Sequence, residues 1–182
     1  MVDVLNEDDE IEDVAALSGA EIPGWLQRLS IPMGWQPVTV LPLTRIAVCG
    51  PRGNGEWEAA DTISVFGYTG WPVFYDVFHN ADRTLRGLNA GGIAVKVLPV
   101  PPIQWTAAVR GSGIALIGDQ SVWVQQSNYV AGSEQPHAGR LIVHNLFVDT
   151  VCRTRLAEDI VQLSDAVYQG FINALGNEHR AG

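Results

Sequence analysis

Three side chains of this 182-residue chain have the types needed for nucleophilic catalysis. Cys49 ends a strand-like stretch directly before the glycine-rich loop 50–55, whose backbone N–H groups could stabilise a negative charge. His144 and Asp149 could supply a base and the group that orients it. The sequence does not give their separation, and it contains neither a Gly-x-Ser-x-Gly nor a Cys-x-x-Cys motif. We therefore expect Cys49 to be a core residue, and a small hydrolase is the alternative.

The residues that could hold a metal or a nucleotide do not have the required spacing. The four histidines, at positions 79, 137, 144 and 179, do not pair with one another or with a cysteine as metal ligands do. The loop 50–55 lacks the Gly-Lys-Ser/Thr ending of a phosphate-binding loop, and the glycines of 111–118 precede strand-like sequence rather than a helix. The sequence thus predicts no metal site and no cofactor.

Negative charge is concentrated at the start of the chain. The formal net charge is −9, and eight acids precede the first base, Arg28, whereas residues 28–182 hold the other 12 acids and all 11 bases. A nearly neutral body argues against binding to nucleic acid or to anionic membranes, which both require clustered positive charge. The acidic residues Glu7, Asp8, Asp9 and Glu10 are candidates for docking to a basic protein partner. The alternative is a solvated tail that aids solubility.

A second candidate for partner binding is a strand face that is both polar and aromatic. Trp123, Gln125 and Tyr129 alternate with Val122 and Val124, and side chains alternate between the two faces of a strand. Tryptophan and tyrosine often anchor protein interfaces. We expect this face to contact a protein partner, and a homodimer is compatible with it. Core packing is the alternative role for most of the six tryptophans.

The chain divides into three parts. Residues 1–22 form an acidic segment that is either a short helix over 6–19 or disordered. Residues 23–176 form one α+β domain, which suits a chain of this length. Residues 177–182 are expected to be a disordered tail, because Gly176 has the properties of a helix stop.

Hydrophobic periodicity predicts the elements of the domain. A period of two predicts strands over 25–32, 43–49, 58–68, 93–98, 103–110, 114–117, 121–130 and 140–150, with a tight turn at 118–120. Spacings of three and four predict a helix over 72–88, with its aromatic face against a sheet, and a long helix over 154–175. The strand around Val143 is apolar on both faces and should be central. This order predicts an α+β fold, a two-layer sandwich with a mostly antiparallel sheet and two main helices packed on it.

The sequence also bears on location. No stretch approaches the roughly 20 apolar residues needed to cross a bilayer. The first ten residues have neither the basic start nor the apolar stretch of a secretory signal peptide. We therefore expect a cytoplasmic protein without membrane insertion, and export by a route that needs no signal stays open.

One turn and the order of the elements resemble a known fold. The Pro-x-Gly-Trp turn at 32–35, the strand before the first helix, the Gly91-Gly92 break and the long hairpin before the last helix are similar to Mog1/PsbP-like proteins, and within them to the mycobacterial LpqN/LpqT group. The resemblance spans residues 25–175. It implies an actinobacterial accessory or partner-binding module without shared catalytic residues. The lipoprotein members carry a signal and a lipidation cysteine, and from the sequence we expect neither in this protein.

These observations favour a non-enzymatic partner-binding or accessory protein. A small hydrolase and a carrier that holds an apolar ligand between sheet and helices are the alternatives.

Overall fold

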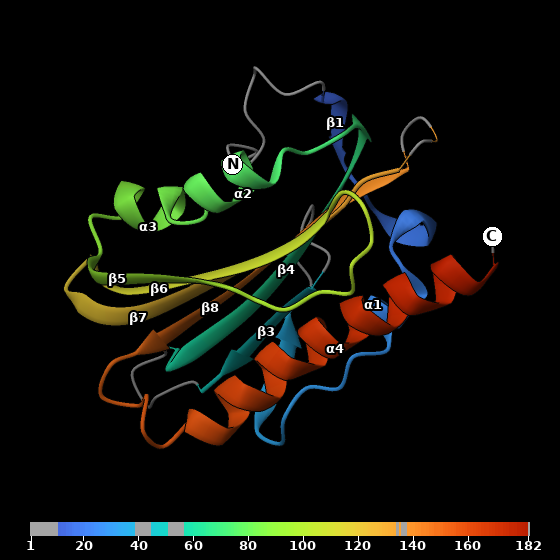
Figure 1. The fold of residues 1–182 in the computed structure, drawn as a ribbon. Coiled ribbons are helices and arrows are strands. Elements are labelled where there is room, and N and C mark those ends of the chain that lie inside the picture. Colours follow the sequence, from blue (N-terminus) through green and yellow to red (C-terminus); the bar gives the residue numbers. More distant parts are fainter. Residues whose placement is uncertain (1–10, 39–44, 51–56, 134, 136–137, 182) are drawn as a thin grey trace.

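The computed structural model describes residues 11–38, 45–50, 57–133, 135 and 138–181 (Figure 1). The elements follow in the order β1 (Ile11–Ala16), η1 (Gly19–Glu21), α1 (Gly24–Gln27), β2 (Trp35–Val38), β3 (Arg45–Cys49), β4 (Ala59–Gly70), α2 (Phe74–His79), α3 (Arg83–Gly87), β5 (Gly91–Val97), β6 (Thr106–Ile117), β7 (Gln120–Ala131), β8 (Gly139–Asp149) and α4 (Ala157–Ala181). The strands pair antiparallel in the order β2-β3-β4-β8-β7-β6-β5, and β1 also pairs with β4. The predicted α+β fold with a mostly antiparallel sheet is confirmed.

Helices cover both faces of this sheet (Figure 1). α2 and α3 bury Val77 and Leu85 against one face. α4 buries Leu163 and Phe171 against the other. The sequence predicted helices packed on the sheet but placed them in one layer, and the structure separates them. We call the two sides of the sheet the α2/α3 face and the α4 face.

The central strands of the sheet agree with the strands predicted from the sequence. β8 lies between β4 and β7, as its two apolar faces predicted. The predicted strands over 103–110 and 114–117 form the single strand β6. Ile117 pairs with Gln120, which leaves Gly118 and Asp119 as a two-residue turn, and Gly118 has the positive φ of 61° that such turns require.

The expected helix over 6–19 is wrong, because residues 11–16 form strand β1. Residues 66–70 of β4 extend beyond the part of β4 that pairs with β3, and β1 pairs with this open edge. Ile11 and Val14 pack against the core cluster that contains Tyr68 and Val77. A short helix is marginal on its own, so pairing with an available strand edge and apolar burial decide the outcome.

The expected strand over 25–32 is also wrong, because it begins with the helical turn α1. Leu26 is buried with Phe171 and Leu175 of α4. Trp25 lies directly on Gly170, where an added Cβ would come within 2.4 Å of the indole ring. Packing on α4 therefore overrides the alternating pattern of this short segment.

The expected helix over 72–88 is divided into α2 and α3, with a break at Asn80–Asp82. The break lies directly over Gly111 of β6, where an added Cβ would be 3.2 Å from the carbonyl oxygen of Ala81 and 3.0 Å from Cδ1 of Leu85. The missing side chain at Gly111 allows the backbone of the break to approach the sheet closely.

α4 begins at Ala157 rather than Thr154 and passes through Gly176 to Ala181. Gly176 is not among the residues with positive φ, so it lacks the conformation that ends a helix. A glycine inside a helix lowers stability by about 1 kcal/mol but does not stop the helix by itself. The expected boundary at 176 and the expected disorder of residues 177–181 are therefore wrong.

Candidate functional site

The structure does not bring the proposed catalytic residues together. Cys49 of β3 pairs with Ala59 of β4, and Ala59 pairs with Val148 of β8. Cys49 therefore lies two strands away from β8, beside Val148 at its C-terminal end. His144 precedes Val148 by four residues, which is about 13 Å along the strand. Because side chains alternate along a strand, His144 and Asp149 face opposite sides of the sheet.

The environment of Cys49 is also wrong for a nucleophile. Its side chain is buried, and its Sγ lies 4.0 Å from Oε2 of Glu58. Burial raises the pKa of the Cys49 thiol, and the negative charge of Glu58 raises it further. A reactive cysteine needs a lowered pKa, because the thiolate is the nucleophile. The described residues thus contain no assembled version of the predicted hydrolase site.

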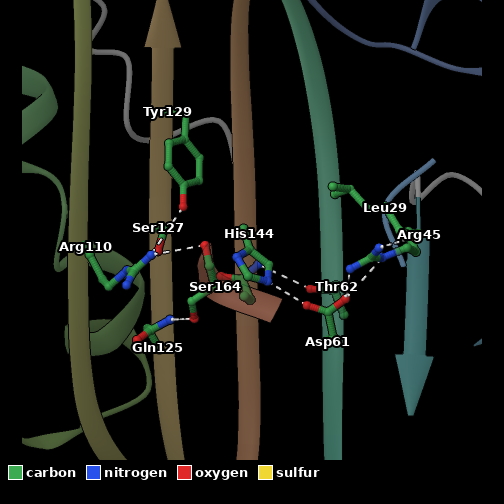
Figure 2. A network of polar contacts seen from close by, with 11 residues as sticks. Leu29, Arg45, Asp61, Thr62, Arg110, Gln125, Ser127, Tyr129, His144 and Ser164 are labelled. Carbon is green, nitrogen blue, oxygen red and sulfur yellow. Dashed lines mark hydrogen bonds and ion pairs between the residues drawn. The ribbon is translucent and has the colours of Figure 1, made fainter. Parts of the chain in front are cut away.

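A different set of polar side chains meets on the α4 face (Figure 2). We call it the polar row, and it consists of one residue from each of five neighbouring strands: Arg45, Asp61, His144, Ser127 and Arg110. Oδ2 of Asp61 accepts a hydrogen bond from Nη2 of Arg45 at 2.7 Å. Its other carboxylate oxygen, Oδ1, lies 2.6 Å from Nε2 of His144. Nε of Arg110 donates to the hydroxyl of Ser127 at 2.8 Å.

The polar row is a structural network rather than a substrate site. Asp61 is 0% exposed and His144 is 1% exposed, so a dissolved substrate has no access to their side chains. Burial by itself raises the pKa of the Asp61 carboxyl, but the hydrogen bonds and positive charges of His144 and Arg45 outweigh burial and lower it. A carboxylate held in this way is costly to leave without a partner.

The residues predicted to face a partner are covered by α4. Trp123, Gln125 and Tyr129 are all buried. The Gln125 amide donates to the hydroxyl of Ser164 on α4 at 2.7 Å, and the ring of Tyr129 packs on Phe171. The expected polar and aromatic face exists, but its contact is within the chain, so its assignment as an exposed partner surface is wrong. Glu7, Asp8, Asp9 and Glu10 lie outside the described residues.

An exposed aromatic surface is present on the opposite face of the molecule. We define it by five residues that are each more than a third exposed: Val73, Phe74, Tyr75, Phe78 and Trp105. Phe74 is 50% exposed and Tyr75 is 65% exposed. The sequence predicted that the aromatic face of this helix lies against the sheet. Instead Val77 is the buried residue of α2, and the side chains of Phe74 and Phe78 are exposed to solvent.

Trp105 is held in a fixed position at the border of the aromatic surface. Its backbone has a φ of 60°, which is uncommon for a tryptophan. Its carbonyl accepts a hydrogen bond from the N–H of Gly132 at 2.8 Å, and its ring lies 5.3 Å from the ring of Trp71. Phe74 and Trp105 both line a cavity of about 300 Å³. Strained backbone that the surroundings hold in place is often found at functional sites.

A larger cavity lies on the α4 face, and its lining includes Gly132, whose N–H bonds to the carbonyl of Trp105. It has a volume of about 770 Å³ and is bordered by η1, α1, the β7–β8 connection and the end of α4. Ile142, Phe171 and Leu175 provide apolar lining, and Arg140 and Glu21 provide charged lining. This volume is in the range of sites for small ligands.

No group of three or more His, Cys, Asp or Glu side chains is placed to hold a metal ion within the described ranges. No helix in the same part of the chain is long and apolar enough to cross a membrane.

The order and pairing of the strands and the helices on both faces define a class of α+β proteins with a known solved member. No protein-family model matches the chain, and no curated protein matches it in sequence. The class is LpqN-like by fold, as the resemblance in element order predicted. A similar solved structure is LpqN of Mycobacterium tuberculosis, which is described as involved in cell envelope biogenesis. It has a TM-score of 0.65 and 14% identity, and the match covers 87% of this chain and 90% of LpqN. An actinobacterial source and a cytoplasmic location stay predictions.

Proposed function

We propose that this protein is a non-enzymatic protein-binding module, and that the aromatic surface on α2 and Trp105 is its binding surface. The observation that carries the proposal is the exposure of four aromatic rings around one short helix, beside a cavity of about 300 Å³. Exposed apolar patches of this kind mark interaction sites, and tryptophan and tyrosine provide much of the binding energy at interfaces. A partner would insert an apolar side chain between Phe74 and Trp105.

Charge indicates which kind of protein would bind. Ile11 pairs with Gly70, which is four residues before Phe74, so β1 begins beside the aromatic surface. The four acids at positions 7–10 directly precede Ile11 in the sequence. The partner we propose therefore has an apolar anchor flanked by basic residues, since complementary charge speeds and orients association.

The proposal can be tested by comparative capture from a lysate of the source cells. The bait is the full chain, and the test variant is Phe74→Ser with Tyr75→Ser. The matched control is Leu116→Ser, which removes a 71% exposed apolar side chain on the α4 face. We expect a partner that is captured by the wild type and by the control and is lost with the double variant, with affinity lowered more than about tenfold.

A third variant examines the acidic residues. Replacing Glu7, Asp8, Asp9 and Glu10 by Gln or Asn should weaken binding and reduce its dependence on salt. A partner retained equally by the double variant and the control would contradict the proposal. The apparent molecular mass of the purified protein should also be measured at increasing concentration. If it rises for the wild type but not for the double variant, the surface joins two copies of this chain instead.

A ligand carrier is the second candidate, and the cavity of about 770 Å³ beside α4 is the observation that favours it. Native mass spectrometry of the protein purified without detergent would test it. A bound small molecule that is lost when Ala174→Trp fills the cavity would support a carrier, and an empty protein from its native source would argue against one.

A further inference from the structure

A second groove, separate from the aromatic surface and from the larger cavity, lies on the α4 face where β5 and β6 emerge beside α4. It has a volume of about 300 Å³. Three cations line it: Lys96 from β5, Arg110 from β6 and Arg153 from the turn before α4. The chain has only 11 lysines and arginines and a net charge of −9, so this gathering is unusual for the molecule. Asp165 is the one acid that lines the groove within the described residues.

Two of these cations are placed directly opposite each other. Lys96 and Arg110 are register partners on the β5–β6 ladder. Like charges at directly opposed positions destabilise an antiparallel pair. An anion that binds between the two side chains would remove this repulsion.

Two of these cations, Arg110 and Arg153, contact neutral groups of the chain. Nε of Arg110 donates to the hydroxyl of Ser127 at 2.8 Å, and its Nη2 lies 3.4 Å from the Tyr129 hydroxyl and 3.5 Å from the Ser164 carbonyl. All three acceptors are neutral. The guanidinium of Arg153 lies 4.6 Å from the centre of the Trp123 ring, which is also neutral.

Three other arginines of the molecule are paired with carboxylates. Arg45 pairs with Asp61, Arg86 with Asp82 and Arg155 with Glu58. Within the described part of the chain, no carboxylate lies within 4.0 Å of the charged nitrogens of Lys96, Arg110 or Arg153. Figure 2 shows Arg110 at one end of the polar row, with Ser127 and His144 between it and the carboxylate of Asp61.

We propose that this groove binds a small organic oxyanion, with a phosphate or carboxylate group between Lys96, Arg110 and Arg153. Guanidinium groups match both kinds of oxyanion through paired N–H donors. The amide of Gln125 and the hydroxyl of Ser164 lie on the same wall and provide neutral polar groups. Ile160 and Val161 line the groove as well, so a short apolar part of the ligand would lie against α4.

The test is a titration of the full chain, labelled with ¹⁵N, at constant ionic strength. The probes are inorganic phosphate, n-butyl phosphate and butyrate. We expect saturable shifts of the Arg110 and Arg153 Nε–H signals and of the Gln125 side-chain amide. The n-butyl group should tighten phosphate binding by at least about threefold through its apolar contact. A preference for butyrate over both phosphates would identify the ligand group as a carboxylate.

Variants separate a built site from general attraction of anions. Lys96→Gln and Arg153→Gln change solvent-exposed side chains and should each weaken binding of n-butyl phosphate by about three- to tenfold. Arg86→Gln on α3 removes the same charge on the α2/α3 face and should leave the affinity unchanged. Arg110 also bonds to Ser127, Tyr129 and Ser164 within the chain, so the test does not rely on a variant of it.

A charge reversal gives an independent measurement. Lys96→Glu would place an acid opposite Arg110, so it should raise the Tm of the ligand-free protein and abolish binding of n-butyl phosphate. The proposal is overturned if no shift saturates, if Lys96→Gln and Arg153→Gln leave the affinity unchanged, or if Arg86→Gln weakens it as much as they do.

Discussion

On the α4 face of the sheet, one helix of 25 residues covers a row of buried charged and polar side chains, whereas on the other face helices of 6 and 5 residues leave aromatic rings exposed. The long helix covers these groups, and within the polar row Asp61 pairs with Arg45 and His144 while Arg110 bonds to Ser127. The two short helices bury only a few residues and present the rest to solvent. We infer that the α4 face provides much of the specificity of folding and that the α2/α3 face is available for binding.

The largest effect should come from removing the carboxylate at the centre of the polar row. Asp61→Ala leaves Arg45 and His144 without their common partner, and we expect a loss of about 3 to 5 kcal/mol of unfolding free energy. Urea unfolding measures it. The control is Asp82→Ala, directly before α3, whose ion pair with Arg86 is partly exposed and should contribute less than about 1 kcal/mol. Equal losses for the two variants would remove the contrast between the faces.

The next effect concerns how α1 is attached to α4. Gly170→Ala would place a Cβ 2.4 Å from the indole of Trp25, and overpacking of this kind typically costs about 1 to 3 kcal/mol. Gly176→Ala is the matched control, because nothing lies within 4 Å of its added Cβ and alanine favours the helix by up to about 1 kcal/mol. Opposite signs in thermal unfolding are expected, and a neutral Gly170→Ala would show that Trp25 can move away freely.

A pair of tyrosines compares the two faces with one chemical change. Tyr129→Phe removes a buried hydroxyl that is bonded to Arg110, with an expected cost of about 1 kcal/mol. Tyr75→Phe removes an exposed hydroxyl and should change stability by less than about 0.5 kcal/mol. Both values come from urea unfolding at one pH, and a larger loss for Tyr75→Phe would contradict the assignment of the faces.

The smallest effect should appear in acid. The folded protein lowers the pKa of Asp61 below the value of about 3.9 expected in the unfolded chain. The carboxylate therefore contributes stability above that pH, and the contribution is lost as the pH falls through the folded-state pKa. The stability difference between the wild type and Asp61→Asn should narrow as the pH falls below about 4. Unfolding curves at a series of pH values test this, and a constant difference would show that the proton binds elsewhere.

The long elements of the fold could be predicted from the sequence, because their hydrophobic periods extend over 11 or more residues, as in β7, β8 and α4. β1 and α1 could not, since each has only 4 to 6 residues and takes its conformation from β4 or α4. The alternation at Trp123, Gln125 and Tyr129 indicated a polar and aromatic face, but the sequence did not show that α4 covers it. The partner of His144 could not be found either, because Asp61 is 83 residues away in the chain.

The pairing of β1 has a consequence for how the molecule avoids self-association. Residues 66–70 of β4 would present unpaired backbone N–H and C=O groups if β1 were absent, and such open edges recruit strands from other molecules. A variant that begins at Ile11 keeps β1 and should therefore remain monodisperse. A variant that begins at Leu17 lacks β1 and should oligomerise or aggregate through β4. β1 thus protects the part of the β4 edge that β3 leaves unpaired, and it does so from within the same chain.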